Sequence, residues 1–99
     1  MTQKTKQLLA YIVKKDPDVS VTSLMKISYL IDLISVKRQS KKQISDFEYR
    51  RYFYGPFDNA IYEYLKQLED EKVLLPKSDY SSFDGKEFIT YSFNAGNEN

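Results

Sequence analysis

The chain has 99 residues, of which 41% are hydrophobic and 29% are charged, and its formal net charge is +1. This composition is typical of one soluble globular domain and argues against wholesale disorder. Because the sequence contains no cysteine and no histidine, it excludes disulfides, thiolate or imidazole metal sites, cysteine nucleophiles and Ser-His-Asp triads.

Opposite charges are concentrated in the two halves of the chain. Residues 1–51 hold eleven Lys/Arg and five Asp/Glu, a net charge of +6, whereas residues 52–99 hold four and nine, a net charge of −5. An asymmetry of this kind marks either a charged partner surface or two faces that are simply solvated differently.

The first predicted helix covers residues 2–15. Its apolar side chains recur at helical spacing, and Pro17 ends it because the residue before a proline avoids the α region. The segment is a poor signal peptide, since an apolar run of only six residues is followed directly by Lys14 and Lys15. No apolar stretch approaches the length that spans a bilayer. We therefore expect a cytoplasmic protein with no membrane partner.

The second predicted helix begins after Ser20, which can cap it, and reaches about Arg38. Its amphipathic stripe comprises Leu24, Ile27, Ile31 and Ile34. Further apolar residues widen this stripe, so we expect the helix to lie centrally in the core.

A basic connector over residues 36–43 leads into "FEYRRYFY", residues 47–54, whose weak alternation and many rings predict a strand. The side chains expected to face the core are Phe47, Tyr49 and Phe53. Gly55-Pro56 ends this strand, and we expect it to form a sharp corner into the next helix.

The third predicted helix runs from Asp58, a suitable N-cap, to Lys72. Its buried stripe would consist of Ile61, Tyr64, Leu65 and Leu68. The remainder predicts a β-hairpin with a turn at Asp84-Gly85 and a second strand over Glu87–Phe93.

These elements predict a single domain over residues 1–94 and a disordered tail over residues 95–99. The expected fold class is α+β, with three main helices, a short strand and a C-terminal β-hairpin. The order of the elements resembles a winged helix in which the hairpin is the wing.

A winged-helix layout suggests DNA binding, but the charges of the third helix argue against it. Residues 58–72 carry a net charge of −3, whereas affinity for DNA comes largely from Lys and Arg that meet phosphates. The connector before this helix is also too long for the turn of a helix-turn-helix. An alternative basic patch would comprise Lys37, Arg38, Lys41, Lys42, Arg50 and Arg51. This patch could bind nucleic acid, contact a protein, or be a solvated connector with a charge-protected strand edge.

The nine tyrosines are a second source of candidate binding residues. Tyrosine is enriched in binding hot spots because it offers rigid apolar area and a polar tip, although most of the nine are expected in or beside the core. Tyr52 and Tyr54 leave the predicted strand on its less apolar face, and Tyr62 lies off the buried stripe of its helix. The candidate partner-binding surface therefore comprises Tyr52, Tyr54, Phe57, Asp58, Tyr62, Glu63 and Glu69.

No catalytic site, cofactor site or metal site is predicted. The carboxylates at residues 69–71 could in principle ligate a hard cation, but consecutive residues of a helix point in different directions. No nucleophile or acid–base pair is positioned by a motif, so we expect a protein without enzymatic activity.

Two blocks of the sequence resemble the Panacea, or SocA-like, antitoxin domain family. The first block, "LMKISYLIDL", is similar to a family helix with the pattern Leu-x-Lys-Leu-Leu-Tyr-x-Ala-Asp, and its matching residues are Leu24, Lys26, Tyr29 and Asp32. The second block, "YGPFDNAIYEYLKQLEDEKVL", is similar to an aromatic-x-Gly-Pro block and its helix, and it matches at Gly55, Pro56, Phe57, Ile61, Tyr62, Leu65 and Leu68. The blocks and the segment between them cover roughly half the chain, which departs from the family pattern at Ile27-Ser28 and Ile31.

The resemblance implies a non-enzymatic antitoxin that binds and neutralises a toxin encoded beside it. In this family the toxins are diverse and include enzymes similar to small alarmone synthetases, while SocA-like members deliver a toxin to a protease. We therefore expect a cognate protein toxin as the partner, with a protease complex as a further partner if the chain acts as an adaptor. The alternative is a winged-helix transcriptional regulator that binds DNA through the basic patch.

Overall fold

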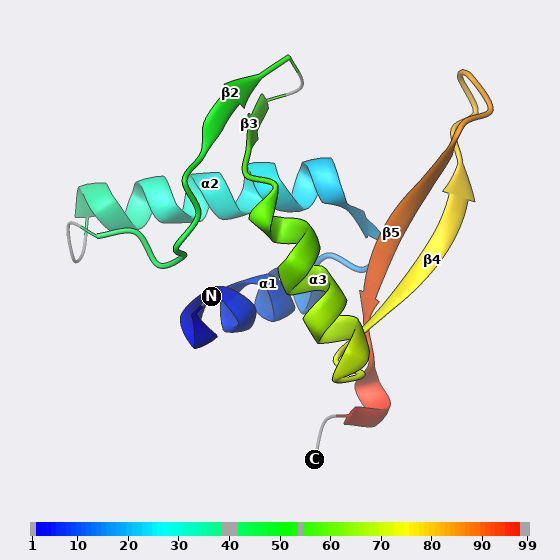
Figure 1. Ribbon diagram of the computed structural model, residues 1–99, viewed down its shortest axis with the longest axis horizontal. Helices are drawn as coiled ribbons and strands as arrows, with labels where there is room; N and C mark the ends of the chain where they lie inside the picture. The colour runs from blue at the N-terminus through cyan, green and yellow to red at the C-terminus, as the bar shows by residue number, and fades with distance from the viewer. Residues whose placement is uncertain (1, 39–41, 54, 98–99) are drawn as a thin grey trace.

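The computed structural model describes residues 2–38, 42–53 and 55–97 (Figure 1). The helices are α1 (Gln3–Lys15), α2 (Val21–Arg38) and α3 (Ala60–Asp70). The strands are β1 (Val19–Ser20), β2 (Arg50–Tyr52), β3 (Gly55–Phe57), β4 (Leu74–Tyr80) and β5 (Glu87–Phe93). The chain is an α+β protein, which confirms the predicted class.

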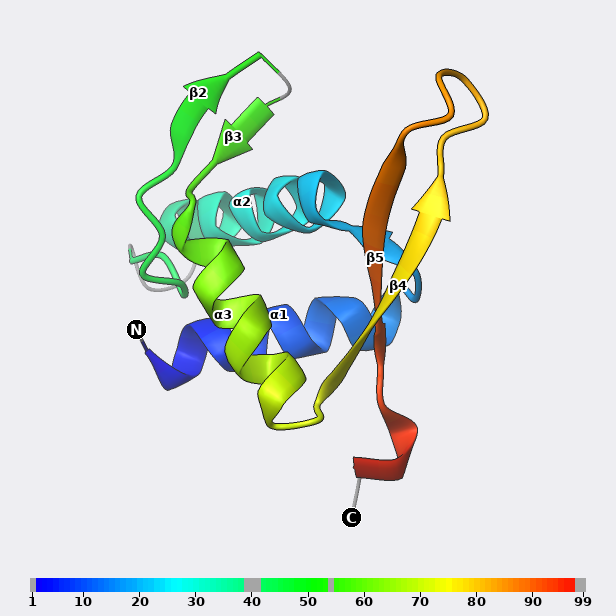
Figure 2. The ribbon, with the colours of Figure 1, turned by 45° about the vertical axis from the view of Figure 1, so that its right-hand side comes forward.

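The helices form two layers, with α1 and α2 in one and α3 in the other (Figures 1 and 2). Helices α1 and α2 run side by side in opposite directions, and α3 crosses in front of them (Figures 1 and 2). Strands β2 and β3 form one antiparallel hairpin, and β4 and β5 form a second hairpin beyond the N-terminal end of α2 (Figure 2). The principal extents are 40 × 39 × 21 Å, so the molecule is a flat disc whose core lies between the helices.

The three predicted helices are present, and their ends lie within about two residues of the expected ones. The Thr2 side chain accepts a hydrogen bond from the Thr5 amide at the start of α1. In the same way, Ser20 Oγ accepts from the Ser23 amide at the start of α2. These are the contacts by which side-chain oxygens satisfy free amides at a helix N-terminus.

The buried face of α2 differs from the predicted one. Its buried side chains are Leu24, Met25, Ser28, Asp32 and Ser35. Ile27 and Ile31 are only partly buried, whereas Leu30 and Ile34 are 49% and 51% exposed. The expectation that α2 lies centrally in the core is therefore wrong. Because this helix is apolar on most sides, its sequence period does not select a face, and the hydrogen-bond partners of Asp32 do.

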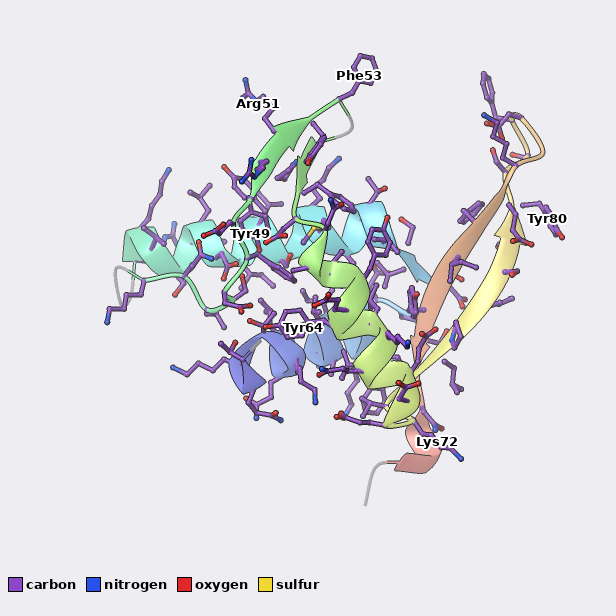
Figure 3. All side chains as sticks on the ribbon, viewed as in Figure 1. Tyr49, Arg51, Phe53, Tyr64, Lys72 and Tyr80 are labelled. Carbon is purple, nitrogen blue, oxygen red and sulfur yellow. The ribbon has the colours of Figure 1, made fainter. Side chains whose placement is uncertain are left out.

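The region around Gly55-Pro56 also differs from the predicted corner into the helix. Residues Gly55–Phe57 form β3, which pairs with β2 so that Tyr52 lies opposite Gly55. The chain thus returns in a hairpin instead of turning directly into the helix, and Gly55 has the positive φ of 120° that glycine adopts most readily. Phe53 at the hairpin tip is fully exposed and points away from the body, so its predicted place in the core is also wrong (Figure 3). The hairpin extends beyond the core, so only the beginning of the 47–54 segment can be buried.

The C-terminal half follows the prediction closely. The buried residues of α3 are Ile61, Tyr64, Leu65 and Leu68, as expected. Strand β5 has the predicted bounds, and Gly85 in the turn has a φ of 73°. The two-residue strand β1, which the sequence did not reveal, pairs Val19 with Tyr91 and gives the strand order β1-β5-β4. Where a disordered tail was expected, Ala95–Asn97 form a short 3-10 helix.

Candidate protein-binding surface

Three rings connect β2, β3 and α3. Tyr52 and Phe57 meet edge to face with ring centroids 6.0 Å apart, and the centroids of Phe57 and Tyr62 are 5.8 Å apart. Phe57 is only 3% exposed, whereas Tyr52 and Tyr62 are 41% and 54% exposed. The two outer tyrosines therefore pack on a buried ring and present apolar area whose position is fixed.

Two of the predicted partner-binding residues have structural roles instead. Phe57 belongs to the core, so it supports the surface without being part of it. Asp58 Oδ1 accepts a hydrogen bond from the Ala60 amide and Oδ2 accepts one from the Glu48 amide, at 2.9 and 2.7 Å. Asp58 thus ties the start of α3 to the segment before β2. Tyr54 lies outside the described residues.

The outward side of α3 is acidic. Glu63 is exposed, Glu69 is half-buried and Asp70 adds another exposed carboxylate, whereas the Glu71 carboxylate is paired with Lys6 Nζ at 2.6 Å. Burial, followed by the nearby Glu69 and Tyr62, raises the pKa of Tyr91 on β5. Glu69 and Tyr62 are therefore near enough to Tyr91 to act on its hydroxyl electrostatically. Together, Tyr52, Tyr62, Glu63 and Glu69 form what we call the α3 surface.

The candidate basic residues line different parts of the molecule. Arg50 and Arg51 line a hollow of about 480 Å³ with Tyr29, Tyr49, Tyr52, Phe53, Gly55 and Pro56. Lys42 instead lines a separate hollow of about 510 Å³ beside α1. Lys37 and Arg38 are exposed in the last turn of α2, and Lys41 lies outside the described residues. The described cations are thus spread over several elements.

A buried hydrogen-bond network around Asp32 was missed by the sequence analysis. Asp32 is 2% exposed, and its carboxylate accepts hydrogen bonds from the Ile44 and Ser45 amides, the Ser45 hydroxyl and the Tyr49 hydroxyl. Burial, and then the hydrogen bond to Asp32, raises the pKa of Tyr49. This network fixes Tyr49, whose ring packs edge to face on Tyr29 with centroids 5.2 Å apart. The sequence feature that could have revealed this network is Asp32 itself, the single acid of the apolar helix α2.

A second network fastens the same connector to α1 and α3. Asp46 Oδ1 accepts hydrogen bonds from the Tyr64 hydroxyl at 2.6 Å and the Thr5 hydroxyl at 2.9 Å. Burial alone would raise the pKa of Asp46, but the hydrogen bonds from Tyr64 and Thr5 outweigh it, so this pKa is lowered. Tyr64 also accepts a hydrogen bond from the Thr2 amide. The connector after α2 is therefore held at two carboxylates, which positions the β2–β3 hairpin.

No family model, no curated protein and no solved structure matches the chain significantly. The resemblance to Panacea domains therefore depends on the two sequence blocks. Over residues 2–38, 42–53 and 55–97, no helix has both the length and the apolar character needed to cross a bilayer.

Proposed function

We propose that this chain is a non-enzymatic, cytoplasmic antitoxin module that binds a cognate protein toxin. Neutralisation would occur either by direct obstruction of the toxin or by delivery of the toxin to a protease. The proposal joins two independent lines of support, namely the resemblance of the sequence blocks and the chemistry of the α3 surface.

The two blocks that carry the resemblance lie against each other. A Cβ placed on Gly55 would be 3.9 Å from Lys26 Cε, so the Gly-Pro block approaches α2 at a position matched to the family pattern. Tyr29 of the first block and Gly55-Pro56 of the second line the same hollow. Residues that belong to one recognition unit should meet in this way, which supports reading the two blocks as a single motif.

The observation that carries the proposal is the exposure of Tyr62 beside acidic residues. This ring packs on buried Phe57 and leaves half of its surface open, next to Glu63 on the outward side of α3. A fixed aromatic ring on a helix whose exposed charges are mainly acidic is suited to a basic protein surface, because the ring supplies affinity and the charges supply orientation and association rate. A toxin that handles nucleotides or nucleic acid has such a surface.

The test is co-expression with the product of the adjacent open reading frame. If this product arrests growth, co-expression of the wild-type chain should restore growth, whereas co-expression of a Tyr62→Ala, Glu63→Lys double variant should not. The matched control is Tyr80→Ala, which removes a tyrosine that is 65% exposed on β4. Cooperative thermal unfolding of both variants would show that they fold. Full rescue by the double variant would refute the α3 surface.

Sequence-specific DNA binding is the second candidate, and the strand order favours it. The series α1, β1, α2, α3, β4 and β5, with β1 beside β5, supports a winged-helix layout in which the β2–β3 hairpin is inserted before α3. Arg50 and Arg51 would then be the first candidates for phosphate contacts. Gel-shift titration at two salt concentrations tests this, since a DNA binder must lose affinity steeply with salt. Absence of a shift at low salt removes the candidate.

A further inference from the structure

Helix α2 carries an apolar stripe that the α3 surface does not include. The stripe comprises Ile27, Leu30, Ile31 and Ile34, at the spacing i, i+3, i+4, i+7 that defines one side of a helix. At about 100° per residue, Leu30 and Ile34 lie nearly opposite the buried Met25 and Asp32. Two neighbouring aliphatic side chains, each half-exposed, thus lie on the side of α2 that faces away from the core.

This exposure has an energetic cost that packing within the domain does not offset. Helix α2 contacts α1, β1, β3 and β5, and these contacts leave 49% of Leu30 and 51% of Ile34 open. Covering the exposed halves of these two side chains would remove apolar surface from water, which favours association with a partner. Scattered exposed aliphatics are ordinary, but an ordered stripe along one helix is the pattern of a docking face.

The charges beside the stripe are all basic. Lys26 and Lys37 flank it on one side and Arg38 follows it in line at the C-terminal end, and all three are exposed. The single acid of α2, Asp32, is buried in its own hydrogen-bond network on the far side of the helix. Any partner that covers the stripe therefore meets three cations and no exposed carboxylate of α2.

These three cations argue against a second copy of the chain as the partner that covers the stripe. A second copy of the chain, packed antiparallel through the stripe, would bring Lys26 of one copy toward Lys37 and Arg38 of the other. A parallel arrangement would place like residues opposite one another, so both arrangements are repulsive. The stripe is also only about 10 Å long, since seven helical steps of about 1.5 Å separate Ile27 from Ile34, and it contains no aromatic residue, unlike helices that lie on membranes.

We propose that the α2 stripe is a docking site for an acidic amphipathic helix of a partner protein. The apolar side of that helix would cover Leu30 and Ile34, and its flanking carboxylates would meet Lys26, Lys37 and Arg38. The site goes beyond the proposed toxin contact, because the acidic α3 surface selects the opposite charge. The chain thus has two binding faces of different chemistry.

The experiment uses the full chain and a fluorescein-labelled helical peptide of about 18 residues, with leucines at i, i+3, i+4 and i+7 flanked by glutamates. A second peptide replaces every glutamate by lysine. Fluorescence anisotropy should show saturable binding of the acidic peptide, weakened by salt, and no binding of the basic one. The double variant Leu30→Gln, Ile34→Gln should weaken binding about tenfold or more, which corresponds to about 1.4 kcal/mol.

The matched control is Leu75→Gln, which changes a leucine that is 48% exposed on β4 and should leave the affinity within about twofold. Lys26→Glu with Lys37→Glu should abolish binding of the acidic peptide while the chain stays folded. Equal binding of both peptides, or binding that survives the Leu30/Ile34 double variant, would overturn the proposal. So would a dimer, or adsorption to anionic vesicles, that this double variant abolishes, because the occupant would then be a second copy or a membrane.

Discussion

The carboxylate of Asp32 accepts hydrogen bonds from two backbone amides and two hydroxyls, and its side chain is buried. An Asp32→Asn substitution keeps the volume but replaces one acceptor by a donor, which would then face the hydroxyl donors of Ser45 and Tyr49. We expect the free energy of unfolding to fall by about 2–4 kcal/mol. Urea denaturation followed by circular dichroism measures this loss.

Tyr49→Phe provides the graded control for the same network. It removes one hydroxyl and leaves the other three donors to Asp32 in place, so its cost should be smaller, about 1–2 kcal/mol. The ring stays in contact with Tyr29 and Phe47. A denaturation midpoint for Asp32→Asn that equals the wild-type midpoint would show that the network does not stabilise the fold.

Asp46 makes part of the stability dependent on pH. Its pKa is lowered from 3.8 in the folded chain, so its contribution is fully present above the unfolded value and is lost as the pH falls through the folded value. We expect the melting temperature to fall as the pH drops below about 4. In Asp46→Asn this fall should be smaller. Because Asp46 is exposed, the effect is modest, and the readout is the difference between the two pH profiles.

Lys72 lies just after α3 and has a left-handed backbone conformation, with a φ of 61°. The Val73 amide donates to the Leu68 carbonyl and the Lys72 amide donates to the Glu69 carbonyl, which is the hydrogen-bond pattern of a Schellman motif. Glycine adopts this conformation at no steric cost, so Lys72→Gly should be more stable than Lys72→Ala by about 1 kcal/mol. Comparing these two variants removes the effect of the lost charge, and equal melting temperatures would contradict the expectation.

Among the elements, the β2–β3 hairpin has one ring, Phe57, that is buried in the core and contacts both Tyr52 and Tyr62. Phe57→Ala removes a buried ring that contacts Tyr52 and Tyr62, and should cost about 3–5 kcal/mol. Phe53→Ala lies in the same hairpin but on a fully exposed side chain, and should change stability by less than about 0.5 kcal/mol. Chemical denaturation of the two variants side by side tests the difference.

An element could be predicted from the sequence when its apolar pattern clearly distinguishes the buried face from the exposed face. Helix α3 has four apolar positions against a charged exterior, so its buried stripe could be read directly. Helix α2 is apolar on most sides, and its orientation depends on Asp32 meeting residues 44–49, which are distant contacts that periodicity cannot reveal. Strand β1 has two residues and exists only because Val19 pairs with Tyr91, a long-range pairing.

The candidate site was predictable to a similar extent. The exposure of Tyr62 and Glu63 could be predicted because both lie off an unambiguous buried stripe. The core position of Phe57 was missed, since the sequence does not show that a hairpin places this ring there. The capping role of Asp58 was predicted, but its hydrogen bond from the Glu48 amide was not. The exposed face of α2 was missed for the same reason as its orientation.

At the scale of the whole molecule, the charge asymmetry of the sequence persists as two helices of different character. The exposed charges of α2 are Lys26, Lys37 and Arg38, whereas α3 presents mainly carboxylates. Because both layers of so flat a molecule are open to solvent, one small domain can offer surfaces of both signs. A single partner of uniform charge could therefore engage only one of them favourably.

Both hairpins end in an uncovered phenylalanine, with Phe53 at 108% and Phe83 at 96% exposure. A protease that cleaves after aromatic residues should therefore reach these two tips before any ring in the helical body. Brief chymotrypsin digestion followed by mass spectrometry should yield fragments that end at Phe53 and Phe83, while the bond after the buried Tyr64 survives. Early cleavage inside α1 or α3 would be incompatible with this packing. Since a bound partner would shield one tip or the other, the cleavage pattern also offers a direct way to map where a partner binds.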